Sequence, residues 1–188
     1  MLLATVCPVD TPLETSRLVL RPFTAADAEQ LIALHNDAEV MRYLNGGKPV
    51  PRERILGETL PRFVRGDFLA AVEKASGGFV GWFHLRPPEG GPADELELGY
   101  RLHRAAWGKG YATEGSLALI DHAFGELGAR RVFAQTMAVN LGSRRVMEKC
   151  GMRFVRTFFE DWPDPIEGAE QGEVEYELRP EDRHPASP

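Results

Sequence analysis

Apolar residues recur along the chain with two different periods, and these periods divide it into short strands and helices. Residues 17–23 follow the two-residue period of a strand, with Leu18 and Leu20 on one side. Residues 113–127 instead place their large apolar side chains on one helical face. The other expected elements are helices over 24–36, 50–65 and 142–150 and strands over 68–73, 79–85, 95–102, 132–139, 154–160 and 174–179.

The order of these elements, β-α-α-β-β-β-α-β-α-β-β, predicts an α/β fold with one sheet of mixed direction. Short connections favour antiparallel hairpins, and a single βαβ unit in the middle requires one parallel pair. We therefore expect a mostly antiparallel sheet of about seven strands flanked by helices, and not a doubly wound parallel sheet. Residues 1–180 are expected to form one domain, and residues 181–188 a flexible tail.

Charge and cysteine content narrow the classes of protein that fit this sequence. A net charge of −6 argues against a nucleic-acid binder and favours a cationic partner. No run of about 18 apolar residues predicts a membrane span, and the apolar stretch Met1–Cys7 lacks the basic region of a signal peptide. Cys7 and Cys150 are the two cysteines, and we interpret them as reduced thiols of a cytoplasmic protein.

One turn has the composition of an anion-binding site. The expected strand at 95–102 is followed by the turn Trp107–Ala112, in which Gly108 and Gly110 precede a helix. The first N–H groups of a helix lack internal partners and carry partial positive charge, and glycine lets the backbone approach a ligand closely. The turn is therefore either a pyrophosphate site or a simple chain reversal. It matches neither the Walker A pattern nor the dinucleotide fingerprint.

Two further segments favour the pyrophosphate site. The segment Glu97–Tyr100 precedes the turn, and the segment Asn140–Gly151 follows the next strand. Together with Trp107–Ala112 they resemble, in order and spacing, three motifs of the GNAT superfamily of N-acetyltransferases, and specifically its RimJ/RimL-like branch. The resemblance extends over about residues 13–180. It implies a GNAT-like splayed sheet and acetyl-CoA, or coenzyme A, as the bound donor.

The same resemblance assigns roles in cofactor binding. N–H groups of Gly108–Thr113 would hold the pyrophosphate, the backbone of Tyr100–Leu102 would pair with the pantetheine arm like an added strand, and Asn140 would bond a pantetheine amide. Arg144, Arg145 and Lys149 either meet phosphates or form a solvated helix face. The residues expected to bind the cofactor are Tyr100, Arg101, Leu102, Trp107, Gly108, Lys109, Gly110, Tyr111, Ala112, Thr113, Asn140 and Ser143.

Transfer to an amine requires the amine to be neutral. Deprotonating a lysine amine at pH 7 costs about 4–5 kcal/mol, whereas an α-amine costs only about 1 kcal/mol. Glu97 is the candidate catalytic base, with a structural salt bridge as its alternative role, and His84 is a second candidate. An N–H of residues 98–100 would stabilise the oxyanion.

The leaving thiolate also needs a proton. Many relatives carry a tyrosine where this chain has Met147, which cannot donate one. Ser143 is therefore the candidate catalytic acid, unless water donates the proton or the thiolate leaves unprotonated.

These observations predict an acetyl-CoA-dependent N-acetyltransferase that uses direct transfer, without a metal, to a primary amine. The acceptor is either a protein N-terminal α-amine or a small molecule such as an antibiotic or a polyamine. A non-catalytic acyl-CoA-binding module is the alternative outside the enzymes. We expect a monomer or homodimer without a nucleic-acid or membrane partner, and an acceptor pocket formed by residues 44–65, 86–94 and 162–172.

Overall fold

The computed structural model describes residues 11–66, 68–160 and 166–183. Its strands are β1 (Leu13–Glu14), β2 (Leu18–Pro22), β3 (Phe68–Glu73), β4 (Phe79–Arg86), β5 (Glu95–Leu102), β6 (Arg131–Met137), β7 (Arg153–Phe158) and β8 (Glu173–Leu178). Its α-helices are α1 (Ala28–His35), α2 (Ala38–Asn45), α3 (Arg52–Arg54), α4 (Leu60–Arg65), α5 (Tyr111–Gly125) and α6 (Leu141–Lys149). None of the helices in the described ranges is long and apolar enough to cross a membrane.

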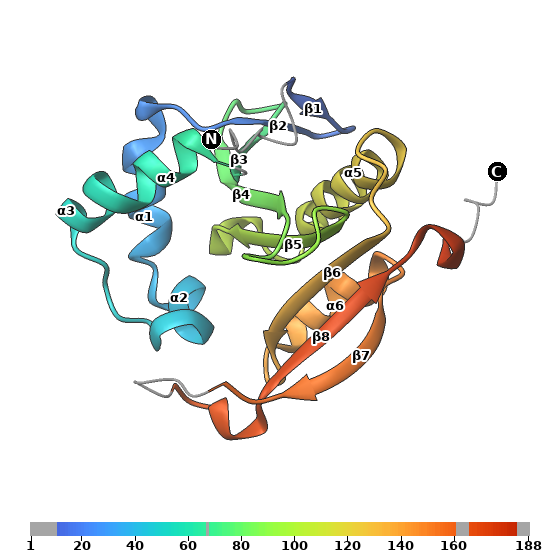
Figure 1. The fold of residues 1–188 in the computed structure, drawn as a ribbon. Coiled ribbons are helices and arrows are strands. Elements are labelled where there is room, and N and C mark those ends of the chain that lie inside the picture. The colour runs from blue at the N-terminus through green and yellow to red at the C-terminus, as the bar shows by residue number, and fades with distance from the viewer. Residues whose placement is uncertain (1–10, 67, 161–165, 184–188) are drawn as a thin grey trace.

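The strands form one eight-stranded sheet in the order β1-β2-β3-β4-β5-β6-β8-β7 (Figure 1). All neighbouring pairs are antiparallel except β5 and β6, which are parallel. The mixed α/β fold expected from the order of elements is therefore confirmed. The additional strand is β1, whose two residues lie opposite Leu20 and Val19 of β2 and are too short to show a period in the sequence.

The sheet opens in its middle. The pairing of β5 with β6 covers only Glu95–Glu97, which lie opposite Arg131–Phe133. Beyond that point β5 continues along β4 as far as Leu102, while β6 continues along β8 as far as Met137. The two halves of the sheet therefore separate, and the edge of β5 that faces β6 keeps unpaired backbone groups after Glu97.

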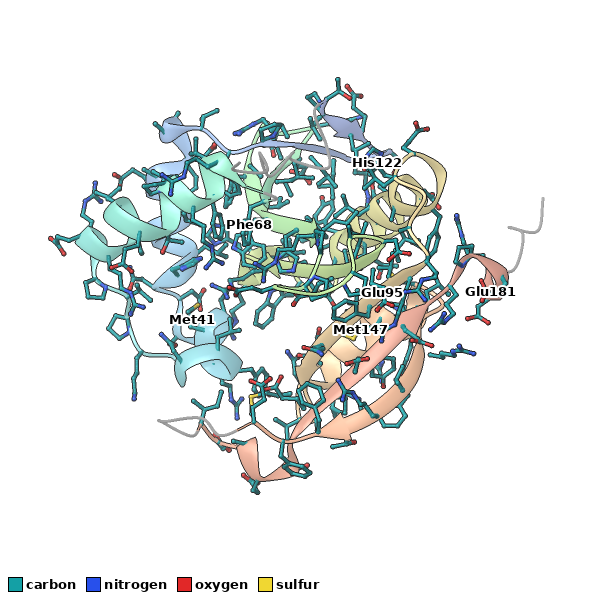
Figure 2. All side chains as sticks on the ribbon, viewed as in Figure 1. Met41, Phe68, Glu95, His122, Met147 and Glu181 are labelled. Atoms are coloured by element: carbon teal, nitrogen blue, oxygen red, sulfur yellow. The ribbon has the colours of Figure 1, made fainter. Side chains whose placement is uncertain are left out.

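Helices cover the two faces of the sheet with separate apolar cores. Leu119 of α5 and Met147 of α6 belong to the larger core, and Phe63 of α4 and Phe68 of β3 belong to the smaller one. Met147 and Phe68 mark the two cores in Figure 2. Alternate residues of β5 face opposite sides. Even-numbered β5 residues such as Leu98 therefore face α5 and α6, and odd-numbered ones face the side of α1.

Two helical features differ from the sequence expectations. Helix α2 was not anticipated, although Asp37 caps it by accepting hydrogen bonds from the N–H groups of Glu39 (3.0 Å) and Val40 (3.3 Å). The expected helix over 50–65 is α3 and α4 joined by a π-helical turn at Ile55–Thr59. Pro61 has no N–H to donate, and a widened turn is a usual way to accommodate such a loss inside a helix.

The C-terminal segment is described as far as Arg183. Pro180–Asp182 form a short 3-10 turn, and the guanidinium of Arg183 pairs with Asp121 on α5. The sequence predicted a flexible tail over 181–188, but Arg183, near the beginning of this range, forms a defined ion pair with α5.

Candidate active site

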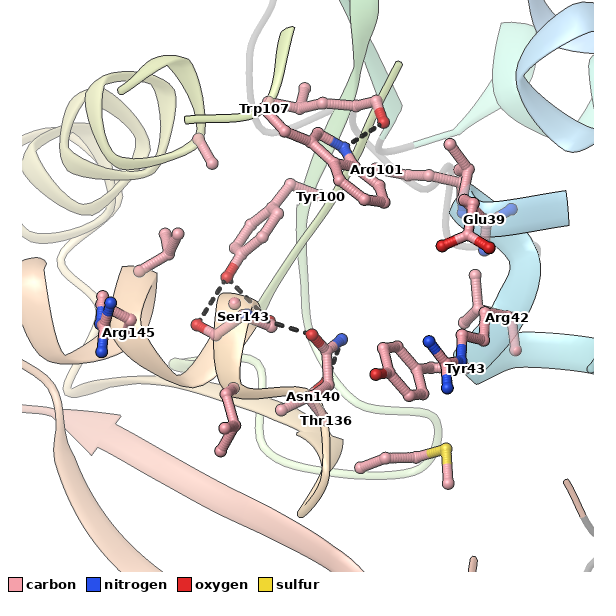
Figure 3. A pocket seen from close by; sticks show the side chains of 18 of the residues that line it. Glu39, Arg42, Tyr43, Tyr100, Arg101, Trp107, Thr136, Asn140, Ser143 and Arg145 are labelled. Atoms are coloured by element: carbon pink, nitrogen blue, oxygen red, sulfur yellow. Dashed lines mark hydrogen bonds between the residues drawn. The ribbon is translucent and has the colours of Figure 1, made fainter. Parts of the chain in front are cut away.

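A cavity of about 810 Å³ lies where β5 and β6 separate. Its walls come from β5, from the turn before α5, from the junction of β6 and α6, and from α2. Figure 3 shows Tyr100 and Ser143 on one side and Glu39, Arg42 and Tyr43 of α2 on the other. The predicted site residues that line it are Tyr100, Arg101, Leu102, Trp107, Gly108, Gly110, Tyr111, Ala112, Thr113, Asn140 and Ser143.

The turn before α5 presents free backbone donors to this cavity. Gly108 and Gly110 have φ values of 72° and 85°, a region that suits glycine. Gly110 occupies the position before the first residue of α5, and no side chain caps the helix there. The first N–H groups of α5 are therefore available to an anionic ligand, as the sequence predicted for a pyrophosphate.

An ion pair behind the turn holds it in place, and sequence reasoning missed it. Arg17 pairs with Glu114 (2.6 Å) and donates from Nη1 to the carbonyl of Lys109 (2.9 Å). Burial alone would raise the pKa of Glu114, but hydrogen bonds from Thr15, Arg17 and Ser16 lower it to about 2. Lys109 was among the residues expected to bind the cofactor, but it does not line the cavity. Its carbonyl instead accepts the hydrogen bond by which Arg17 holds the turn in position.

The start of α6 brings three polar side chains together. Asn140 caps the helix, because its Oδ1 accepts the N–H of Ser143 (3.2 Å), and its Nδ2 donates to Oγ1 of Thr136 (3.1 Å). The Tyr100 hydroxyl donates to the Ser143 carbonyl (3.1 Å) and lies 2.9 Å from the Ser143 Oγ. Burial raises the pKa of Tyr100, so its hydroxyl keeps its proton.

The tyrosine next to Ser143 thus comes from β5 and not from α6. Met147, which the sequence analysis compared with the tyrosine of similar proteins, is buried in the larger core. Tyr100 and Ser143 are 43 positions apart in the chain, and no local pattern connects them. The only signal available in the sequence was the even-numbered position of Tyr100 on β5, which directs it towards α6.

Glu97 lies near the cavity but is not among the residues that line it. Its Oε2 accepts a hydrogen bond from Arg86 Nη2 (3.2 Å), and its Oε1 lies 3.9 Å from His84 Nε2. Burial, followed by the charges of three arginines, lowers the pKa of His84 to about 3. A histidine with such a pKa is a weak proton acceptor at pH 7, which argues against His84 as the base.

Two other sequence expectations concern cysteine and metal. Cys150 is a buried free thiol whose pKa burial raises to about 12, which leaves it unreactive as a nucleophile. Cys7 lies outside the described residues. In the described ranges no cluster of His, Cys, Asp and Glu has the arrangement of a metal site.

The acceptor side of the cavity differs from the expected one. Of the three segments expected there, residues 44–65, 86–94 and 162–172, only Leu44 and Ile166 line the cavity among the described residues. On this side the cavity is also lined by Glu39, Val40, Arg42 and Tyr43 of α2, together with Met137 and Glu173 at the ends of β6 and β8. Helix α2 was missed in the sequence, and so was its part in the site.

Comparison with known proteins connects this geometry to a family. Residues 17–153 match the model of the acetyltransferase (GNAT) domain. The chain is 35% identical over 185 residues to the FsC-acetyl coenzyme A-N(2)-transacetylase of Aspergillus fumigatus, covering 90% of this chain and 77% of that protein.

Solved structures share the fold. A GNAT-family acetyltransferase from Bacillus anthracis superposes with a TM-score of 0.78 at 23% identity, covering 91% of this chain and 99% of that one. The spermidine N-acetyltransferase of Vibrio cholerae, solved with CoA and spermine, gives 0.72 at 17% identity, covering 89% and 98%. Together with the family match, the parted strands and the uncapped helix facing the cavity make this chain a member of the GNAT family and an acetyl-CoA-dependent N-acetyltransferase.

Proposed function

We propose that the enzyme acetylates the primary amine of a small molecule, and that this amine is an α-amine. The observation that carries the proposal is the cavity of about 810 Å³, which extends from the turn before α5 to helix α2. A volume of this size accommodates one small ligand beside the end of the pantetheine arm. The relative from Aspergillus fumigatus is named for transfer from acetyl coenzyme A to an N(2) atom, which supports a small-molecule acceptor here.

Two finer assignments remain proposals that rest on the sequence. Membership of the RimJ/RimL-like branch rests on the three motifs, and a protein N-terminal α-amine is the acceptor that this branch suggests. A cytoplasmic location rests on the reduced state expected of the cysteines.

The described residues suit the donor in two respects. The N–H groups of Gly110–Thr113 would hold the pyrophosphate, and the unpaired edge of Tyr100–Leu102 would pair with the amides of the pantetheine arm. Acetyl-CoA supplies the activated thioester. Backbone N–H groups of β5 would stabilise the charge that develops on its carbonyl oxygen, because they are already oriented and need no reorganisation.

We propose Ser143 as the donor of the proton to the leaving thiolate. When the Tyr100 hydroxyl donates to the Ser143 carbonyl, the Ser143 hydroxyl is the donor in the 2.9 Å contact with the Tyr100 oxygen, and it would turn this proton towards the thiolate. Tyr100 would hold Ser143 in place, which makes it a positioning residue.

We propose that Glu97 removes the amine proton through a bridging water, since it lies on the opposite face of β5 from Tyr100 and does not line the cavity. Glu97→Gln should then lower kcat/KM at pH 7 by about a hundredfold and remove the acidic limb of its pH profile. Arg86→Met is the control, because it breaks the same ion pair but keeps the carboxylate. An equal loss in both variants would leave Glu97 only its structural role.

The test of the function uses thiol release and product mass spectrometry with three groups of acceptors. These are small α-amines, polyamines, and peptides with free N-termini. We expect transfer to small α-amines, with acetyl-CoA raising the thermal stability of the protein. Transfer to peptide N-termini alone would contradict the small-molecule acceptor, and no thermal stabilisation by millimolar CoA would contradict the assigned donor site.

A further inference from the structure

The cavity wall formed by β5 and α2 contains a half-buried positive charge, the guanidinium of Arg101, that has no negative partner among the described residues. Arg101, on β5, lines the cavity, and its guanidinium lies 4.9 Å from the centre of the Trp82 ring. Its Nη1 donates to the His35 Nε2 (3.1 Å) and contacts the Met41 sulfur (3.4 Å). Across the part of the chain that the structure describes, no carboxylate forms an ion pair with it.

Arg101 keeps its charge in this setting. Burial, with a smaller contribution from Arg62, lowers the pKa of Arg101 to about 10, so the guanidinium is still protonated at pH 7. Burial and Arg101 lower the pKa of His35 to about 3, so this neighbour is neutral and accepts a hydrogen bond through Nε2. A partly desolvated charge without a paired counter-ion costs the fold some free energy, and a ligand that provides the counter-ion would offset this cost.

The donor is not the source of that counter-ion. Tyr100 and Leu102 face α5 and α6, on the side of the pyrophosphate turn, whereas Arg101 faces His35 of α1 and Met41 of α2. Its side chain therefore lies on the opposite face of β5 from the expected phosphates. The nearby Arg42 of α2 already pairs with Glu167 (3.4 Å), which leaves Arg101 as the cation available in this wall.

The other donors of Arg101 are accessible. Nε and Nη2 have no hydrogen-bond partner among the described residues, yet neither is a fully buried unsatisfied atom. Arg101 lines the cavity, so an acceptor bound there would lie within reach of a guanidinium that still has free donors. Two adjacent guanidinium donors match the two oxygens of a carboxylate.

We propose that Arg101 binds the carboxylate of the acceptor, so that the substrate class is small amino acids in which both the α-amine and a carboxylate are free. The inference rests on the proposed function, because it identifies which small amines enter the cavity. Arg101 follows directly on the β5 backbone expected to hold the thioester carbonyl, so the amine and the carboxylate must lie close together in the acceptor. The same charge repels polyamines, which carry cations where Arg101 requires an anion.

The experiment compares acceptors that differ in one charge. Initial rates of thiol release are measured for common L-amino acids, for their primary amides and for spermidine. At neutral pH a larger fraction of the amide than of the amino acid is in the reactive neutral-amine form, because losing the carboxylate lowers the pKa of the amine. We nevertheless expect the best amino acid to exceed its amide in kcat/KM by on the order of thirtyfold.

Variants of Arg101 then test whether this residue causes the preference for the amino acid over its amide. Arg101→Met should remove this preference while the Kd for CoA stays within about twofold, since Arg101 contributes only backbone to the donor. Arg101→Lys keeps a charge without the planar fork and should retain part of the preference. Arg62→Met removes a neighbouring positive charge outside the cavity and should leave the preference unchanged.

The outcomes separate the inference from the proposed function. Equal use of amino acids, amides and spermidine by the wild type, or an unchanged preference in both Arg101 variants, would overturn the carboxylate role while amine acetylation stands. Binding of acetyl-CoA without transfer to any amine would contradict the proposed function, and the inference with it.

Discussion

Helix α5 begins at the turn that we propose binds the donor, and the position of this helix depends on one close contact with the sheet. A Cβ added at Gly115 would lie 2.4 Å from Cζ of Phe83 and 2.8 Å from two further ring atoms. Ordinary carbon contacts are about 3.5–4.0 Å, so Gly115→Ala must displace the helix or the ring by roughly 1 Å. Phe83 is fully buried, so its ring has no free space to enter.

The expected loss of stability follows from two opposing terms. Overpacking of a core costs about 1–3 kcal/mol, and replacing a helical glycine by alanine recovers up to about 1 kcal/mol. For a chain of this length a net loss of about 1–2 kcal/mol lowers Tm by roughly 2–8 °C. Because the displacement reaches the turn at the N-terminus of α5, the KM for acetyl-CoA should rise in the same variant.

Thermal unfolding followed by circular dichroism measures the effect, with Gly125→Ala as the matched control. Gly125 lies in the same helix, but no atom lies within 4 Å of an added Cβ. This control should leave Tm unchanged or raise it slightly. If Gly115→Ala were as stable as Gly125→Ala, the reasoning that close packing on Phe83 sets the position of α5 would be refuted.

Three further predictions concern the α6 end and the C-terminal strands. Asn140→Ala should lose about 1 kcal/mol in urea unfolding and raise the KM for acetyl-CoA, whereas Asn140→Asp should recover the stability, because it keeps the capping oxygen, but not the affinity. Ser143→Ala should lower kcat about tenfold with little change in that KM, and unaltered turnover would exclude it as the acid. Burial would raise the pKa of Glu177, but hydrogen bonds from Arg131 and Arg153 lower it to about 2. Since its unfolded pKa is about 4.3, this carboxylate stabilises the fold fully above that pH and loses the contribution as the pH falls to about 2. Glu177→Gln should therefore cost about 1–2 kcal/mol in urea unfolding at pH 7, and the difference from the wild type should vanish near pH 2; a difference that does not depend on pH would contradict this account.

The sequence was most informative where the structure depends on neighbours within one turn or one strand. The two-residue period of Leu18 and Leu20 predicted β2, because alternation is a property of the strand itself. Gly108 and Gly110 predicted a tight turn before an uncapped helix, because a positive φ and free helix N–H groups are local features. These patterns, read with the three motifs, were enough for the fold class, the family and the donor.

The shorter and irregular elements could not be predicted from the sequence. Helix α2 is eight residues long, and its N-terminal Asp37 directly follows another expected helix, so its start signal had no separate context. The end of the β5–β6 pairing after Glu97 leaves no mark in either strand, since both continue as regular strands beside other partners.

The chemistry of the acceptor side was decided by tertiary structure alone. Tyr100 meets Ser143 across 43 positions, and Arg101 meets His35 across 66. Whether a charged side chain forms an ion pair depends on which distant side chains the fold places around it. Glu97 forms an ion pair with Arg86, whereas Arg101 forms none with any carboxylate among the described residues. Sequence periodicity determines the face on which a side chain lies, but only packing of the distant elements determines what that face meets, and therefore which amine the enzyme can accept.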